Sequence, residues 1–238
     1  MTIKEMHYDF KKKFNKIDSQ QNKNLLGPEI DWTLNEAHEL FVKMIIKPRI
    51  KNHLGFETSQ RSIDDIRTLV VSPESDPNAS ITVVDNTVIM PVDYWHFIKA
   101  TVTISKEKCS NREAVFVPRQ HDDEFENSPF DKSSFVWKVV NGLFFENGIK
   151  LHDDGTFKNE KLNITYIKSL PYIHNAEDFR NGQYKLPSGT LLTGSVDSPL
   201  PNHTHREIVD IAVLIATGEI NPVDYQIKLQ KLTMNNLI

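Results

Sequence analysis

Apolar residues recur at helical spacing in the first part of the chain. In residues 2–17 they fall every three or four positions with lysines on the other side, which predicts an amphipathic helix. A second helix is predicted from Pro28, because proline is tolerated at the first helical position, and Pro48 ends or kinks it. The stripe of this second helix consists of Ile30, Leu34, Ala37, Phe41, Met44 and Ile45. "SIDDIRTLV", which begins at Ser62, predicts a further short helical turn.

The middle of the chain changes to the pattern of β-strands. "ITVVDNTVIM" predicts two strands around a turn at Asp85-Asn86, and alternation from Phe97 to Ile104 predicts another strand. "EAVFVP" and "KLNITYIKSLP" predict two more, and "HDDEFENSPFD" is acidic and loop-like. In "SSFVWKVVNGLFFENGIKLH" the Asn141-Gly142 dipeptide predicts a tight hairpin. About six short strands are therefore expected between helical ends.

These patterns predict an α+β fold. We expect N- and C-terminal helices packed together around a central antiparallel β-sheet or small sandwich. The predicted parts are an N-terminal helical region (1–67), a central antiparallel β domain (68–170), an extended connection (171–202) and C-terminal helices that pack on the N-terminal region (203–238). Asn221-Pro222 predicts the start of the last of these helices.

The stretch "HREIVDIAVLIATG" (205–218) predicts a helix that is apolar on almost every side. Thr204 and Glu207 fit a capping box, and Gly218 fits a helix C-cap. Apolar residues cover roughly 260° of the helical wheel, against the ~100° stripe of a surface helix. We expect the following side chains to pack into the subunit and against a second helix: Ile208, Val209, Ile211, Val213, Leu214 and Ile215. That helix belongs either to the N-terminal pair of the same chain or to a neighbouring subunit, and the sequence leaves both alternatives open.

Composition narrows the class of protein. The 238 residues are 39% hydrophobic and 25% charged, with a net charge of −4, so the chain lacks the basic balance of a protein that grips nucleic acid. A single cysteine, Cys109, excludes an intramolecular disulfide and cysteine-rich zinc motifs. The opening "MTIKEMHYDF" has no hydrophobic signal core, and the apolar run at 205–218 is far short of the ~20 residues that span a bilayer. We therefore expect a soluble, non-secreted protein without membrane contact.

The candidates for chemistry are generic. His203 and His205 would face the same way on a strand and share a metal, but a polar start to the following helix is the simpler interpretation. The acidic clusters at 121–124 ("HDDE") and 152–155 ("HDDG") fall in predicted loops, where Asp153, Asp154 and Gly155 make a β-turn. The nucleophile-elbow, P-loop and dinucleotide motifs are absent from the sequence. We expect no catalytic residues, no cofactor and no bound metal.

Several segments in order resemble virion proteins of crAss-like bacteriophages. They are "KIDSQQNKNLLGPEIDWTLNEAHELFVKMIIKPR", "GFETSQRSIDDIRTLV", "MPVDYWHFIKATVTI", "CSNREAVFVPRQHDDE", "SPFDKSSFVWKVV", "LNITYIKSLPYI" and "HREIVDIAVLIATGEINPVDYQIKLQKL". The likeness covers about 15 to 235 and is least between 175 and 200. More distantly, helical termini around a β-rich middle resemble the head–tail adaptors and tubular tail proteins of short-tailed phages.

The resemblance implies a non-enzymatic structural protein of the virion. It implies one of twelve subunits in a homo-oligomeric ring at the head–tail (portal–tail) interface or in the short tail. Its partners would be other copies of itself, the portal or neighbouring tail ring proteins, and DNA that passes through the lumen without specific binding. Two alternatives stay open. One is a metal-dependent hydrolase that uses His203, His205 and an acidic loop, and the other is a non-virion binding module for tail assembly.

Overall fold

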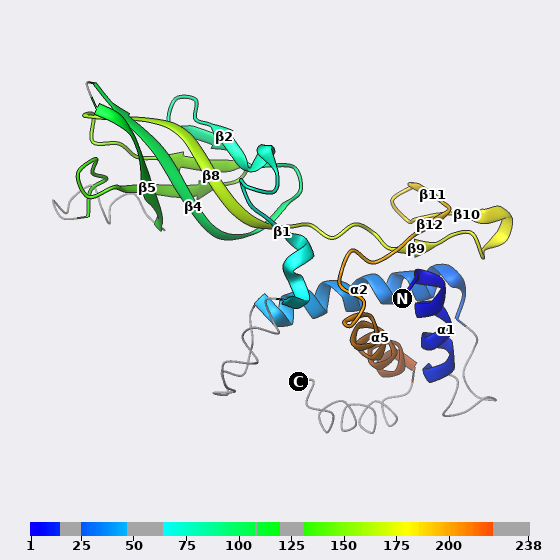
Figure 1. Cartoon of the computed structure of the whole chain (residues 1–238). Helices are drawn as coiled ribbons and strands as arrows, with labels where there is room; N and C mark the ends of the chain where they lie inside the picture. The colour runs from blue at the N-terminus through cyan, green and yellow to red at the C-terminus, as the bar shows by residue number, and fades with distance from the viewer. Residues whose placement is uncertain (15–24, 47–63, 108, 120–130, 221–238) are drawn as a thin grey trace, which may run out of the picture. The chain divides into compact units, whose positions relative to one another are not determined.

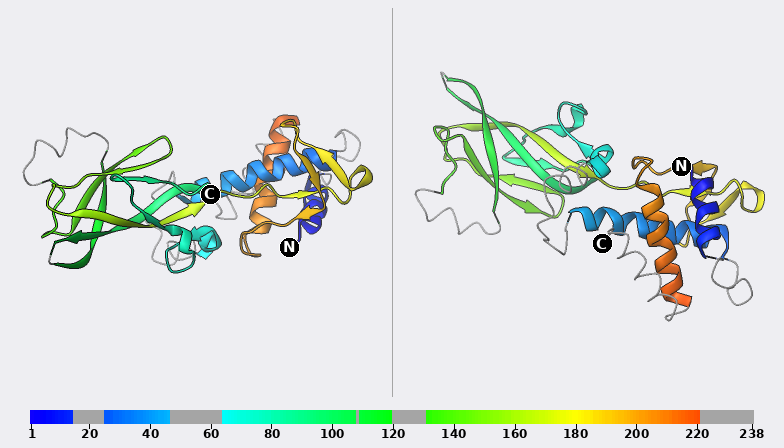
Figure 2. Two further views of the ribbon diagram at one scale, coloured as in Figure 1. Left: turned by 90° about the horizontal axis from the view of Figure 1, so that it is seen from above. Right: turned by 60° about the horizontal axis from the view of Figure 1, so that its bottom comes forward.

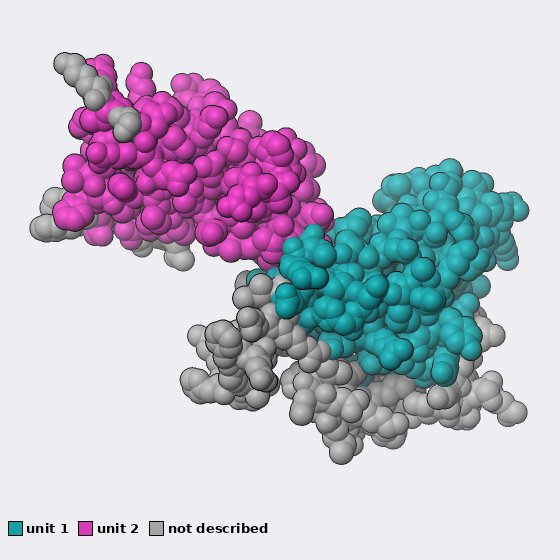
Figure 3. Space-filling model, viewed as in Figure 1, with its two compact units in different colours: residues 1–68, 170–238 teal, residues 69–169 magenta. Residues whose placement is uncertain are grey.

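The chain has an α+β fold with a curled, mostly antiparallel sheet (Figure 1). The computed structural model describes residues 1–14, 25–46, 64–107, 109–119 and 131–220. The chain divides into two compact units, and Figure 3 colours them separately. Unit 1 is Met1–Thr68 with Leu170–Ile238, and unit 2 is Leu69–Ser169. The short helical turn predicted for "SIDDIRTLV" is confirmed at residues 64–69. Its predicted capping residue Ser62, the segment "HDDEFENSPF" and the helix from Asn221-Pro222 lie outside the described residues. That the helices pack around the sheet stays a prediction.

Unit 2 consists of one eight-stranded sheet in the order β1-β8-β4-β5-β6-β7-β3, with β2 also paired to β8. The strands are β1 (Val70–Val71), β2 (Ser80–Thr82), β3 (Thr87–Ile89), β4 (Tyr94–Lys106), β5 (Cys109–Arg119), β6 (Val139–Phe145), β7 (Gly148–Leu151) and β8 (Lys158–Lys168). Two 3-10 turns, η1 (Arg67–Leu69) and η2 (Pro77–Ala79), flank β1 and β2. All pairs are antiparallel except β5 with β6, which are parallel. The expected antiparallel sheet is thus confirmed for all pairs but this one. A parallel pair needs a longer connection than a tight hairpin, and β5 and β6 are separated by residues 120–138 in the sequence.

The turn predicted at Asp85-Asn86 is confirmed. Both residues have positive φ (49° and 58°), and Val84 and Thr87 exchange two backbone hydrogen bonds across them. This is the geometry of a two-residue hairpin, which Asp and Asn tolerate better than most residues. The turn joins β2, which pairs with β8, to β3, which pairs with β7. It therefore links the two edges of the curled sheet.

The hairpin predicted at Asn141-Gly142 is wrong. Both residues lie inside β6, and the chain turns at 146–147, between the paired residues Phe145 and Gly148. Gly142 is required for close packing, since an added Cβ would lie 2.8 Å from the carbonyl oxygen of Lys150. Asn141 is fully buried, and its side chain accepts a hydrogen bond from Arg119 Nε at 3.2 Å. The dipeptide therefore serves packing and hydrogen bonding rather than chain reversal.

The core of unit 2 lies inside the curl of the sheet. Alternate residues of β4, β5 and β8 point inward, as a strand with one buried face requires. Phe135 and Phe157 extend this core with ring centroids 6.3 Å apart. The largest fully buried side chains of the unit are Leu69, Ile104, Ile149, Leu151, Leu162, Ile164 and Tyr166.

The described part of unit 1 contains three long helices and a small set of short strands. The helices are α1 (Ile3–Phe14), α2 (Gly27–Ile46) and α5 (His205–Ile220). Between 170 and 200 the chain forms β9 (His174–Asn175) paired to β12 (Ser195–Val196), η3 (Arg180–Gly182), and β10 (Gln183–Lys185) paired to β11 (Leu191–Thr193). The α5 helix packs against both α1 and α2, and β9 packs on α2 (Figure 2). The segment expected as an extended connection, 171–202, lies within unit 1 and forms two short strand pairs there.

The ends of α5 differ in part from the sequence prediction. The helix begins at His205, and the carbonyl of Thr204 accepts the amide of Ile208, as the residue before a helix does. The Thr204 hydroxyl donates to the carbonyl of Pro201 at 2.9 Å. The helix does not end at Gly218 but continues to Ile220. The predicted C-cap glycine is therefore an interior helical residue.

Candidate functional site

A buried carboxylate joins four elements of unit 1. Asp31 lies on α2 with none of its surface exposed. Its Oδ1 lies 2.7 Å from His7 Nε2 on α1, and its Oδ2 accepts the hydroxyl of Tyr184 on β10 at 2.8 Å. The backbone amide of Asn175 on β9 lies 3.2 Å from both carboxylate oxygens. Burial and this hydrogen bond to Asp31 raise the pKa of Tyr184, so the hydroxyl stays protonated and donates.

A buried carboxylate needs several donors to offset its lost hydration, and Asp31 has them. Its acceptor atoms are thus occupied by groups of the same chain. The arrangement holds α1, α2 and the strands β9 and β10 together through the two Asp31 oxygens. We interpret it as structural.

Two further histidines, His38 on α2 and His205 at the start of α5, are buried and interact electrostatically. His38 is 1% exposed, and its Nε2 lies 3.2 Å from Ser198 Oγ. His205 is also buried, with Nε2 2.8 Å from the carbonyl of Leu200. Burial, together with the charge that His205 can carry, lowers the pKa of His38 to about 4. Burial also lowers the pKa of His205. Both imidazoles are therefore neutral at neutral pH.

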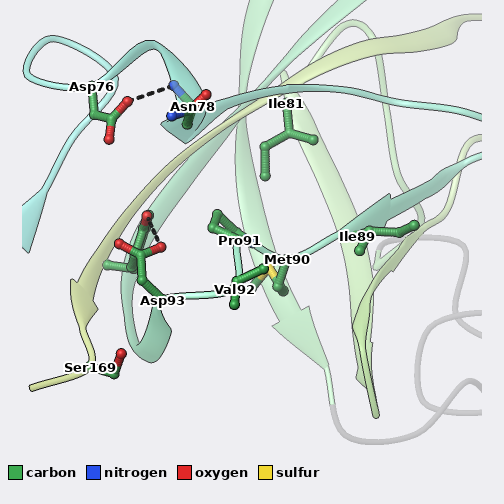
Figure 4. Close-up of a pocket in the computed structure, with 10 residues that line it drawn as sticks. Asp76, Asn78, Ile81, Ile89, Met90, Pro91, Val92, Asp93 and Ser169 are labelled. Carbon is green, nitrogen blue, oxygen red and sulfur yellow. Dashed lines mark hydrogen bonds between the residues drawn. The ribbon is translucent and has the colours of Figure 1, made fainter. Parts of the chain in front are cut away.

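An open hollow of about 580 Å³ lies on unit 2. Figure 4 shows η2 and β2 on one side of it and the segment 89–93 on the other. Its wall is mixed: apolar side chains come from Ile81, Ile89, Met90, Pro91 and Val92, and polar ones from Asp76, Asn78, Asp93, Tyr166 and Ser169. The hydroxyl of Tyr166 donates to Asp93 Oδ1 at 2.9 Å. This hydrogen bond and burial raise the pKa of Tyr166, with burial the larger cause.

An exposed apolar turn is the second surface feature of unit 2. Ser134 and Val139 exchange backbone hydrogen bonds of 2.8 and 3.1 Å, which closes the turn between them. At its tip Val136 is 74% exposed and Trp137 is 79% exposed. Sequence reasoning missed this feature because "SSFVWKVV" alternates like a strand, and nothing in the pattern marks where the chain leaves the sheet.

Five of the six interface residues predicted on α5 lie in the core of unit 1. Ile208 and Val209 have no exposed surface, Ile211, Val213 and Leu214 have at most 9%, and Ile215 is half-buried. The second helix expected to cover them is present within the same chain, since α5 packs against α1 and α2. Lys13 of α1 also forms an ion pair with Asp210 at 2.7 Å. Contact of these residues with a neighbouring subunit stays a prediction, although the apolar excess that motivated it is already enclosed.

The histidines considered as metal ligands have separate partners. His203 Nε2 lies 2.6 Å from Asp65 Oδ1, whereas His205 Nε2 meets the Leu200 carbonyl. Among residues that the structure describes, no group of three or more His, Cys, Asp or Glu side chains is arranged to hold a metal ion. The turn predicted at Asp153-Asp154-Gly155 is confirmed, since both aspartates accept backbone amides two residues on and Gly155 has φ 75°. "HDDE" lies outside the described residues.

No family model matches the chain, and no curated protein matches it. Over the described ranges no helix is both long enough and apolar enough to cross a membrane. The fold and its sites define an α+β protein of two units. One unit carries a closed polar network, and the other carries an open hollow and an exposed apolar turn.

Proposed function

We propose that this chain is a virion structural protein, a subunit of an oligomeric ring in the head–tail (portal–tail) interface or the short tail of a bacteriophage. The observation that carries the proposal is the ordered series of segments that resemble ring proteins of crAss-like phages. In this role the chain is not an enzyme, and it contributes part of the channel through which the genome leaves. The expected packing of the helices around the sheet belongs to the same proposal.

Two physical features support this role. Unit 2 exposes several large apolar side chains, among them Val84, Ile89, Val92, Val136 and Trp137. Apolar side chains that are exposed together mark interaction sites, and here Ile89 and Val92 line one hollow while Val136 and Trp137 are adjacent in one turn. The net charge of −4, repeated around a ring, also suits a channel wall that must not retain DNA, because like charges repel phosphates.

Mass spectrometry of purified phage particles tests the proposal. The chain should be present in many copies, in a fixed ratio to the portal protein that is close to one to one if both rings have twelve subunits. A tail-assembly module would instead be abundant in infected cells and lacking from particles, and that result would overturn the proposal. Metal bound in stoichiometric amount to the purified chain, measured by elemental analysis, would favour the hydrolase alternative.

A further inference from the structure

The exposed turn of unit 2, residues 134–139, is anchored to the core of the unit. Phe135 points inward, where its ring is 6.3 Å from that of Phe157 and 4.8 Å from the guanidinium carbon of Arg112. The Trp137 amide donates to Ser134 Oγ at 3.4 Å. Because the turn is anchored at Phe135 and closed at its base, Val136 and Trp137 project without the entropy cost of ordering a loose loop. We call Val136, Trp137 and the exposed Lys138 the knob.

Hydrogen bonds hold the chain in place on both sides of the hollow. Met90 donates its amide to Asn147 O at 3.0 Å, and Asp93 O accepts the Ser169 amide at 2.7 Å. Opposite, Asp76 Oδ1 accepts the Asn78 amide at 2.9 Å and holds η2 in place. Val92 is fully exposed at the rim, and Ile89 is 72% exposed. The apolar rim of the hollow is therefore preformed and exposed to solvent.

The knob and the hollow are complementary in chemistry. An indole ring buries about 150–250 Å² and carries one N–H that can only donate. The hollow supplies apolar contacts from Ile89, Met90 and Val92 and carboxylate acceptors from Asp76 and Asp93. Lys138, next to Trp137, brings a positive charge toward these carboxylates. A volume of about 580 Å³ accommodates a Trp side chain with its neighbour.

We infer that the knob of one copy of this chain docks in the hollow of the next copy. Knob and hollow are different patches of the same unit, so each contact leaves one free knob and one free hollow. Such a head-to-tail contact propagates, and it gives a closed ring when the rotation between copies closes. Trp is one of the residue types enriched at the energetic centre of interfaces. The contact anchors a larger interface, since a stable one buries about 1,600 Å² in total.

This inference rests on the proposed function only where it takes the assembled product to be a closed ring. Self-association itself can be measured on the purified chain. Trp137→Ser removes the knob, and Val92→Arg blocks the hollow at a fully exposed position that the fold does not need. Trp32→Ser is the matched control, an exposed tryptophan on α2 of unit 1. Sedimentation equilibrium is measured for each chain alone and for an equimolar mixture of the first two variants.

The wild-type chain and Trp32→Ser should self-associate alike, and the two test variants alone should associate at least tenfold more weakly. Mixed together, the two variants should form dimers and nothing larger, because only one intact knob meets one intact hollow. The dimer also shows that both variants are folded. Undiminished association of Trp137→Ser, failure of the mixture to dimerise, or a wild-type chain that stays monomeric up to precipitation would each overturn the inference. The presence of the chain in phage particles, by contrast, tests only the proposed function and not this contact.

Discussion

Acidification should destabilise unit 1 through His38. Its pKa is lowered to about 4, by burial first and by the neighbouring His205 second. The folded state thus favours the neutral imidazole, so this stability is complete above the unfolded pKa of about 6.5 and is lost as pH falls toward 4. A fall from 6.5 to about 4, at 1.36 kcal/mol per pKa unit, corresponds to about 3 kcal/mol.

The test compares the wild-type chain with His38→Gln, which keeps an amide within reach of Ser198 but does not titrate. The free energy of unfolding is measured by urea titration of helical ellipticity at several pH values from 7.5 to 4, a window set by the two pKa values above. Groups near the pair, including His205, Asp197 and the amino group of Met1, are common to both chains, so the difference isolates His38. Between these limits the wild type should lose about 3 kcal/mol more than the variant. Equal pH dependence of the two chains would refute the reasoning.

Three further substitutions probe the packing. Asp31→Ala leaves the hydroxyl of Tyr184 and two other buried donors unsatisfied, and it should lower the urea stability of the helices by about 3–5 kcal/mol, whereas Asp31→Asn should cost less. Gly142→Ala forces a Cβ against the Lys150 carbonyl and should lower the free energy of unfolding by about 1–3 kcal/mol. The measurement is amide hydrogen exchange, which should be faster in β6 and β7 and unchanged in α2. Ile211→Asp buries an unpaired charge in the core of unit 1, so it should lower the free energy of unfolding by more than about 4 kcal/mol. Backbone amides of α1 and α5 should then exchange faster with solvent, and unchanged exchange would contradict the placement of α5.

Local patterns were sufficient for most elements of the fold. The turn at Asp85-Asn86 could be predicted because its signal lies in the turn residues themselves, which adopt positive φ. The hairpin predicted at Asn141-Gly142 was wrong for the opposite reason. Its role depends on Arg119 and Lys150, which are brought to β6 by strand pairing that no local pattern reveals.

The buried network could not be predicted from the sequence. Asp31 is bound by Asn175 and Tyr184, which lie 144 and 153 residues further along the chain. The same limit applies to α5, where the apolar pattern predicts that the helix must be covered but not by which partner. The structure supplies α1 and α2 of the same chain as that cover.

The most direct test of the central claim is an electron-microscopic reconstruction of the head–tail region of the phage particle. We expect a closed ring of identical subunits around the channel, with density for a curled sheet and for α1, α2 and α5 in each, and with residues 134–139 of one subunit seated against residues 89–93 of the next. A neck and tail whose every ring is filled by other folds would contradict it.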